Sequence, residues 1–206
     1  MLRVFRVTCL VVGFMLASNL SAAQAQTTTQ PAEATKFVAA LTDRVSSVLA
    51  RYEQGSETDR HALTQLAEEA FALDVVSRFV LGPTWQQASS AQQEEFQRVF
   101  SQWMVSVYGR RLGASKGGSL KVAGTDTIAN GDALVKMIAT QSDGKTVDLA
   151  LRVRDVRGEM KIIDVIAAGV SMATTQRQEF ASIISNQGID GLLTSLRAKA
   201  ASADAS

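Results

Sequence analysis

The chain has 206 residues, with 21 lysines and arginines against 20 aspartates and glutamates, and it contains one cysteine and one histidine. This near-neutral balance argues against a dedicated nucleic-acid-binding protein, which normally carries a basic excess or a basic face. A single cysteine cannot form an internal disulfide, and one histidine with one cysteine cannot build a usual zinc site. Ser-His-Asp catalysis would depend on His61 alone, so the composition disfavours that chemistry as well. The length predicts one domain.

The first 25 residues have the pattern of a secretory signal peptide. Arg3 and Arg6 precede an apolar run over residues 7–20, and the tripeptide Ala-Gln-Ala at residues 23–25 forms a small-x-small cleavage site. The run is shorter than the roughly 20 residues that span a bilayer, so a permanent anchor is the less favoured alternative. We therefore expect cleavage near Ala25 and export of a cysteine-free chain, which suits a bacterial envelope.

Two stretches outside the predicted domain lack the pattern of a packed structure. Residues 26–34 are rich in Thr, Gln, Ala and Pro and are expected to form a flexible tail, and residues 200–206 are expected to be disordered. A single domain should then occupy residues 35–199. Apolar residues at helical spacing predict helices over residues 35–52, 59–72 and 74–80, with Asp74 as a candidate N-cap, before Gly82-Pro83 breaks the chain.

The clearest helical pattern covers residues 90–112. Ser90 and Gln93 have the spacing of a capping box. Apolar side chains then recur at intervals of three and four on one face, and polar side chains occupy the other. The apolar stripe consists of Phe96, Val99, Phe100, Trp103, Met104, Val107 and Tyr108. The pattern predicts a long amphipathic helix with an aromatic buried face.

The next part of the chain changes its period from 3.6 to 2. Strands are predicted over residues 119–128, 133–141, 146–154 and 159–167, separated by Asn-Gly, Asp-Gly and Arg-Gly turn signals. These connections are too short for crossovers, so the sheet should be an antiparallel meander. In the third strand Val147, Leu149, Leu151 and Val153 point to one side, and Asp148, Arg152 and Arg154 point to the other.

The helical period returns after residue 172. Thr175 and Gln178 are spaced as a second possible capping box, Gly188 predicts a break, and a last helix follows it. Helices, then a meander, then helices indicate an α+β fold in which helices cover one face of a curved sheet. A long aromatic helix across such a sheet either closes a solid core or stands off and leaves a pocket, and packing alone favours the solid core.

Several segments resemble the MlaC or toluene-tolerance family of periplasmic phospholipid carriers. They are residues 71–82 (FALDVVSRFVLG), Trp85, residues 92–100 (QQEEFQRVF), 108–112 (YGRRL), 163–180 (IDVIAAGVSMATTQRQEF) and 188–193 (GIDGLL). Their order and spacing cover residues 37–199, nearly all of the predicted domain. The sequence departs from the family pattern at Pro83-Thr84 and has a shorter segment at residues 186–188.

The resemblance implies a sheet like that of nuclear transport factor 2, with added helices that enclose an apolar cavity. It implies a monomeric shuttle in the periplasm that exchanges phospholipid with an inner-membrane ABC transporter carrying an MCE-domain subunit, and with an outer-membrane lipoprotein and porin complex. Such a shuttle would maintain outer-membrane lipid asymmetry. The phosphate head group would lie near the mouth of the cavity.

A carrier of this kind needs apolar surface and no catalytic chemistry. Two acyl chains contain roughly 30 methylenes, and at about 0.8 kcal/mol for each methylene their exposure to water costs on the order of 20 kcal/mol. The pocket must shield them without binding far more tightly than a bilayer. It requires no cofactor, metal or catalytic residue, which fits the scarcity of histidine and cysteine.

The predicted lining comes from the apolar faces of the long helix, the sheet and the segments around the mouth. For each residue the alternative is ordinary core. The lipid-contacting candidates are Phe100, Trp103, Met104, Val107 and Tyr108 on the helix, Val135, Met137, Leu149, Leu151 and Val165 on the sheet, and Phe79, Leu81, Trp85, Val170 and Met172 at the mouth. Arg78, Arg110 and Arg111 are head-group candidates because guanidinium groups match phosphate geometry, with solvated or paired surface arginines as the alternative.

Three other functions stay open at this point. Asp164 interrupts an apolar run and could be the general base of an isomerase-like enzyme acting on a small molecule, although period-2 spacing favours a structural or surface role. A carrier of hopanoid or another terpenoid lipid would share the same family. A protein with a filled core would serve interaction alone.

Overall fold

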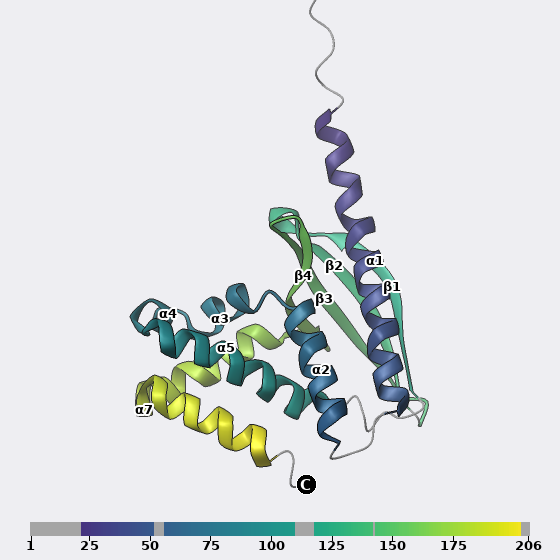
Figure 1. Cartoon of the computed structure of the whole chain (residues 1–206). Coiled ribbons are helices and arrows are strands. Elements are labelled where there is room, and N and C mark those ends of the chain that lie inside the picture. Colours follow the sequence, from purple (N-terminus) through teal and green to yellow (C-terminus); the bar gives the residue numbers. More distant parts are fainter. Residues whose placement is uncertain (1–21, 52–55, 110–117, 142, 203–206) are drawn as a thin grey trace, which may run out of the picture.

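The computed structural model describes residues 22–51, 56–109, 118–141 and 143–202 (Figure 1). It contains helices on one side of a sheet and beside it, so the predicted α+β class is confirmed, with five strands instead of four. No helix within these ranges is both long and apolar enough to cross a membrane. The helical elements are α1 (Ala22–Arg51), α2 (Glu57–Ala70), α3 (Leu73–Leu81), α4 (Thr84–Gln87), α5 (Ser90–Met104), the π-helical turn η1 (Val105–Gly109), the 3-10 turn η2 (Ala129–Gly131) and α7 (Met172–Ser202).

The sheet is an antiparallel meander in the order β1-β2-β3-β4-β5. Its register pairs Val135 with Leu151 and Leu151 with Val165, so these three side chains share one face. We call it the inner face, and it confirms the alternation predicted for the third strand. The strands are β1 (Ser119–Thr127), β2 (Ala133–Thr140), β3 (Thr146–Val156), β4 (Glu159–Ala167) and the short β5 (Val170–Ser171).

Left-handed turn residues set the register of the hairpins. Asn130 has φ 67° and Gly131 has φ 78°, and at the next described hairpin Arg157 has φ 60° and Gly158 has φ 88°. Arg157 and Gly158 alone join β3 to β4, and a two-residue hairpin favours this geometry because it matches the twist of the flanking strands. Asn130 and Gly131 lie instead within the longer β1–β2 connection that contains η2. The Asn-Gly and Arg-Gly signals in the sequence therefore mark real turns.

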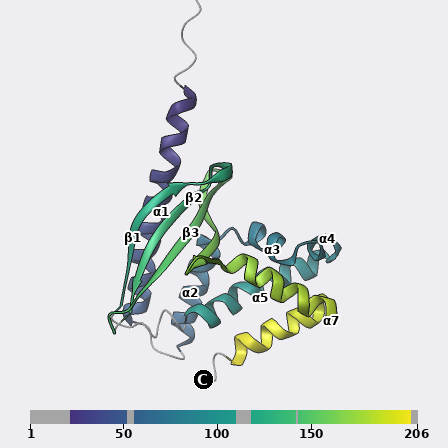
Figure 2. The ribbon, with the colours of Figure 1, turned by 180° about the vertical axis from the view of Figure 1, so that it is seen from behind.

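Helix α1 lies along the inner face of the sheet, mainly on β1 and β2 (Figure 1). It begins at Ala22, so residues 26–34, which the sequence assigned to a flexible tail, belong to this helix. Ala34 and Val38 are fully buried against Val135 and its neighbours in one apolar cluster. Seen from behind, the opposite face of the sheet is covered by none of the helices within the described ranges (Figure 2).

The remaining helices form a second layer beside β4. Helix α5 packs mainly on α7, α3, α2 and η1, and no strand is among its principal neighbours. The expectation that the long aromatic helix lies across the sheet is therefore wrong. Its aromatic face is buried because α7 folds back over it, after a break at Gly188 (φ 68°) that confirms the predicted interruption.

Aromatic rings make the centre of this helical layer. The rings of Phe96 and Phe100 stack with their centroids 5.3 Å apart, and the rings of Phe100 and Trp103 stack with centroids 5.6 Å apart. Phe180 of α7 meets all three rings edge-on at 5.8–5.9 Å. Edge-to-face and offset pairs are the favourable arrangements of aromatic rings.

The buried apolar residues form separate clusters. One lies within α3, α4, α5 and α7 and includes Phe100 and Phe180, and a second lies between α1 and the inner face and includes Val38 and Val135. A smaller third cluster joins α1 to α2 around Leu63. The core is therefore divided between the helical layer and the sheet.

Polar contacts along β4 join the two layers. The amide of Ala72 donates to the carbonyl of Ile162 at 3.0 Å, next to a parallel bridge between Phe71 and Ile162. Lys161 Nζ donates to the carbonyl of Glu69 at 2.7 Å. The start of α3 and the end of α2 are thus fixed to the edge of the sheet.

Two helix starts differ from the sequence prediction. The capping box at α5 is formed by Ser89 and Gln92 instead of Ser90 and Gln93, and α3 begins at Leu73, so Asp74 lies in its first turn instead of capping it. Near-identical cap residues in succession make such shifts of one position common.

Candidate functional site

Six of the predicted lining residues lie in solid core. Leu81, Trp85, Phe100 and Trp103 belong to the cluster of the helical layer, and Val135 and Met137 belong to the cluster beneath α1. Each is almost fully buried by protein atoms.

A second group of predicted lining residues is only half-buried, although every member is apolar. Leu149, Leu151 and Val165 project from the inner face of β3 and β4, and Met104 and Val107 project from the end of α5 and from η1. We call these five the half-buried apolar set. Helix α1 covers β1 and β2 far more than β3 and β4, so it leaves this part of the inner face partly open.

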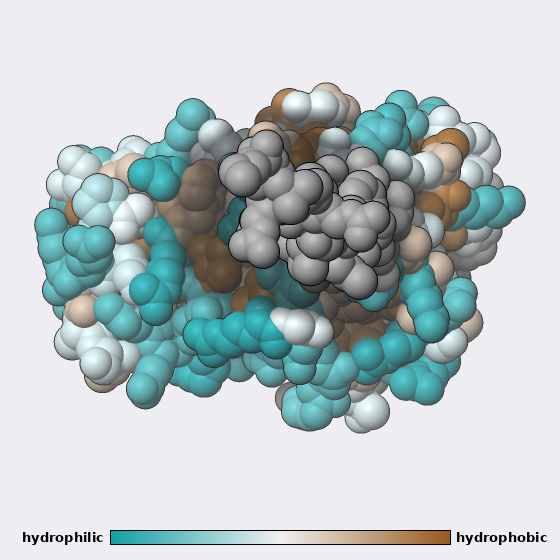
Figure 3. Space-filling model, turned by 90° about the horizontal axis from the view of Figure 1, so that it is seen from above, coloured by the Kyte–Doolittle hydropathy of each residue, from teal (hydrophilic) through white to brown (hydrophobic). Residues whose placement is uncertain are grey.

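The surface is hollowed where apolar side chains gather. Seen from above, brown apolar side chains lie deep in a recess on the helical side of the grey atoms, and teal hydrophilic side chains surround it (Figure 3). Met172, at the start of α7, is also half-buried.

The remaining candidates lie on the surface or outside the described residues. Phe79 and Val170 are 42% and 53% exposed. The side chain of Tyr108 lies outside the described residues, as do Arg110 and Arg111. Arg78 is exposed, and its guanidinium lies 5.3 Å from the ring centroid of Trp85.

Asp164 has a structural role at the start of α7. Its Oδ2 accepts a hydrogen bond from Ser171 Oγ at 2.6 Å, and its Oδ1 accepts one from the amide of Ala173 at 3.0 Å. Ser171 Oγ in turn accepts from the amide of Thr174 at 3.1 Å, so the cap is not the predicted pair at residues 175 and 178. Both carboxylate oxygens are engaged at a helix N-terminus, where negative charge is favourable.

Replacing Asp164 by alanine should lower the free energy of unfolding by about 1–2 kcal/mol, because the substitution removes the cap of α7 and a tie between α7 and β4. Urea unfolding followed by circular dichroism measures the change. The control is Asp148→Ala, which removes an exposed carboxylate from the neighbouring strand. Equal midpoints for the two variants would contradict the capping role.

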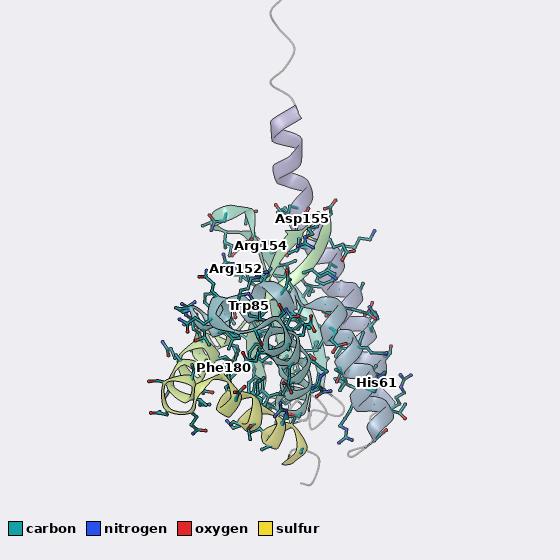
Figure 4. All side chains as sticks on the ribbon, turned by 60° about the vertical axis from the view of Figure 1, so that its left-hand side comes forward. His61, Trp85, Arg152, Arg154, Asp155 and Phe180 are labelled. Atoms are coloured by element: carbon teal, nitrogen blue, oxygen red, sulfur yellow. The ribbon has the colours of Figure 1, made fainter. Side chains whose placement is uncertain are left out.

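A buried carboxylate joins two arginines on the opposite, outer face of the sheet. The Asp132 side chain is 1% exposed, Arg152 Nη2 lies 2.6 Å from its Oδ2, and Arg154 Nε lies 2.7 Å from its Oδ1. The side chains of Arg152 and Arg154 lie close together (Figure 4). Burial raises the pKa of Asp132, but hydrogen bonds and charge from Arg154 and Arg152 outweigh it and hold this pKa below its ordinary value.

Asp132→Asn should therefore lower the free energy of unfolding by about 2 kcal/mol at neutral pH, a value reduced because the two arginines are one-third exposed. A carboxyl with a lowered folded pKa stabilises the protein above its unfolded pKa of about 4, and this contribution is lost as the pH falls through the folded pKa. The gap between variant and wild type should thus be constant from pH 7 to about 5 and close below pH 4. A gap that persists in acid would contradict this account, and Asp126→Asn, at the exposed Lys136 pair, is the control.

The histidine and the acidic side chains form no candidate metal or catalytic cluster in the described part of the chain. His61 is exposed on α2 and lies apart from the labelled aromatic and arginine side chains (Figure 4). The described residues hold no group of three His, Cys, Asp or Glu side chains that could bind a metal ion.

Two arginine–aromatic contacts escape sequence analysis. Arg177 stacks on Phe79 and Arg78 on Trp85. The first pair is 98 residues apart in sequence, and no spacing rule links such positions. Phe37 and Leu41 of α1 also pack against the cluster at the inner face, and the helical spacing over residues 35–52 did not show what they contact.

The class of fold is that of a solved phospholipid-binding protein. The structure of a phospholipid-binding protein from Ralstonia solanacearum, in complex with a phospholipid, superposes with a TM-score of 0.69 at 22% identity and covers 83% of this chain and 98% of that one. At this identity the likeness establishes the shared fold.

The sequence comparisons then identify the family. The family described as MlaC protein matches residues 35–198, so this chain belongs to the MlaC family. The "Intermembrane phospholipid transport system binding protein MlaC" of Haemophilus influenzae is 24% identical over 132 residues, which are 62% of this chain and 62% of that protein. The match thus spans less than two thirds of the relative.

Proposed function

We propose that this protein is a phospholipid carrier of the bacterial envelope. It belongs to the MlaC family, shares its fold with a phospholipid-bound protein, and resembles a protein named for intermembrane phospholipid transport. In this proposal it is exported to the periplasm, exchanges lipid with an inner-membrane ABC transporter that carries an MCE-domain subunit, and exchanges lipid with an outer-membrane lipoprotein and porin complex.

The observation that carries the proposal is the divided core. Leu149, Leu151 and Val165 lie at the border of the cluster beneath α1, Met104 and Val107 lie at the border of the cluster of the helical layer, and all five are apolar yet half-buried. Apolar surface left open to water is unfavourable by about 25 cal/mol for each Å². Acyl chains between the inner face and the helical layer would remove this surface from water.

The chemistry of the site fits cargo that reacts with nothing. Acyl chains offer no hydrogen bonds, so a lining of leucine, valine and methionine holds them by burial alone, and flexible methionine adapts to chains of different shape. Asp164, the leading candidate for a general base, is occupied as the cap of α7. The proposal accordingly includes neither catalysis nor a cofactor.

The head group would remain in solvent at the mouth. Arg78 is the head-group candidate whose position the structure describes, and its exposed guanidinium keeps donors free while it lies on Trp85. Guanidinium forks match phosphate oxygens in geometry.

Native mass spectrometry of protein purified from a Gram-negative host tests the function. We expect a mass excess equal to one or more phospholipids that disappears after organic extraction. Identification of the extracted lipid separates a phospholipid carrier from a hopanoid or terpenoid carrier. Protein that never carries lipid, even after incubation with vesicles, would contradict the proposal and favour a protein with a filled core.

A further inference from the structure

An exposed patch of aromatic and arginine side chains lies at the end of α3. Phe79 is 42% exposed, and the guanidinium of Arg177 from α7 lies 5.1 Å from its ring centroid. One residue earlier, Arg78 lies over Trp85 in the same way at 5.3 Å. We call Arg78, Phe79, Trp85 and Arg177 the aromatic–arginine patch.

The two arginines of this patch lack the carboxylate partners that six other described arginines have. Arg44, Arg51, Arg98, Arg152, Arg154 and Arg197 each lie within 4.0 Å of a carboxylate. Among the described residues, neither Arg78 nor Arg177 forms such an ion pair; their partners are aromatic rings and a carbonyl. Their positive charge is therefore not neutralised by direct contact within the described chain.

Arg177 is also held in place. Its Nη1 donates to the carbonyl of Phe79 at 2.9 Å, near the C-terminus of α3, where positive charge is favourable. A Cβ on Gly82 would lie 3.1 Å from Arg177 Nη2, and Gly82 itself has φ 56°, so glycine provides both the turn and the space for this guanidinium. The remaining donors of Arg177 are available to an external anion.

The patch matches the chemistry of a lipid surface better than that of a protein partner. A stable protein interface buries on the order of 1,000 Å² or more around a cluster of apolar side chains. Only three large apolar side chains are exposed in the described chain. Phe79 lies on α3, whereas Ile138 and Val170 lie on the sheet. An exposed aromatic side chain in a patch with two arginines that lack carboxylate partners is instead suited to phosphates with acyl chains beneath them.

We propose that the aromatic–arginine patch docks this protein onto the surface of a bilayer that contains anionic phospholipid. Arg78 and Arg177 contact lipid phosphates, and Phe79 enters the boundary between head groups and acyl chains. With so few contacts the attachment is weak and reversible, as a shuttle that must leave the membrane requires. The inference rests on the proposed carrier function for the choice of a lipid surface.

Vesicle co-sedimentation of the full chain tests the docking. The probes are vesicles of phosphatidylglycerol with phosphatidylethanolamine and vesicles of phosphatidylcholine alone. We expect binding to the first that weakens with added salt, and at least about fivefold weaker binding for Arg177→Gln, because one arginine near the anionic surface is lost. Phe79→Ser should weaken binding at low and at high salt alike.

Two control variants match these changes elsewhere on the surface. Arg157→Gln removes an exposed arginine at the β3–β4 turn, and Ile138→Ser removes a side chain that is 39% exposed on β2. Both should bind vesicles as the wild type does. Equal binding by Arg177→Gln, Arg157→Gln and the wild type would overturn the docking proposal, as would wild-type protein that does not sediment with anionic vesicles.

The lipid content of the same preparations separates this inference from the proposed function. Arg177→Gln protein that carries wild-type amounts of lipid but loses vesicle binding supports docking as a separate step. Wild-type protein that carries lipid but does not distinguish anionic from phosphatidylcholine vesicles overturns the docking proposal alone, and points to an acidic protein as the partner of the patch.

Discussion

Replacing Phe180 by alanine should lower the free energy of unfolding by about 3–5 kcal/mol, among the largest effects of any single substitution in this chain. Phe180 is 2% exposed, and its ring contacts those of Phe96, Phe100 and Trp103. The substitution therefore leaves a cavity between α7 and α5. Urea unfolding followed by circular dichroism at 222 nm, the usual helix signal, measures the change.

The control for Phe180 is the exposed phenylalanine of α3. Phe79→Ala removes the same atoms from the surface, where substitutions usually change the free energy of unfolding by no more than about 0.5 kcal/mol. A Phe180→Ala variant as stable as Phe79→Ala would show that the rings do not hold the helical layer together.

Replacing Leu151 by glutamate should reduce the lipid that co-purifies with the protein at least about tenfold, because a carboxylate buried beside acyl chains has no hydrogen-bond partner. Leu151 lies at the centre of the inner-face part of the half-buried apolar set, paired with Val135 and Val165. Quantitative mass spectrometry of the extracted lipid, normalised to protein, measures the loss.

Ile138→Glu is the matched control for this change. Ile138 is an apolar strand residue on the opposite face and is 39% exposed, so its replacement adds the same charge away from the proposed lipid. Its lipid content should equal that of the wild type. Equal lipid loss in both variants, or in neither, would contradict binding at the inner face.

The sheet could be predicted closely from the sequence because its signals are local. Alternation along β3 showed which side chains share a face, and the Asn-Gly and Arg-Gly pairs marked left-handed turns that the structure has. The short β5 was missed, since two residues carry no period.

The position of the long helix could not be predicted in the same way. The stripe through Phe96, Phe100 and Trp103 shows that one face is buried but does not show what covers it. In the structure that cover is α7, which is brought back by the turn at Gly188, instead of the sheet. Long-range packing decided this, and helical periodicity contains no information about it.

The candidate site was predictable in type but not in detail. Met137 and Leu149 are directly paired neighbours on one face, yet Met137 is sealed beneath the α1 side of the sheet and Leu149 is half-buried. Their sequence patterns are the same, because the difference comes from where α1 ends its cover. Asp164 was placed away from the inner face by its spacing, but its role as a cap depends on α7 beginning beside β4.

In the proposed carrier, acyl chains lie between the inner face and the helical layer. Loading the protein with a phospholipid that carries a photoreactive group in its acyl chain, followed by irradiation and peptide mass spectrometry, tests this claim most directly. We predict cross-links on both walls, around Leu149 and Leu151 on β3 and around Met104 and Val107 at the end of α5 and in η1. Cross-links confined to the exposed positions Ile138 and Val170, or absent from one of the two walls, would contradict it.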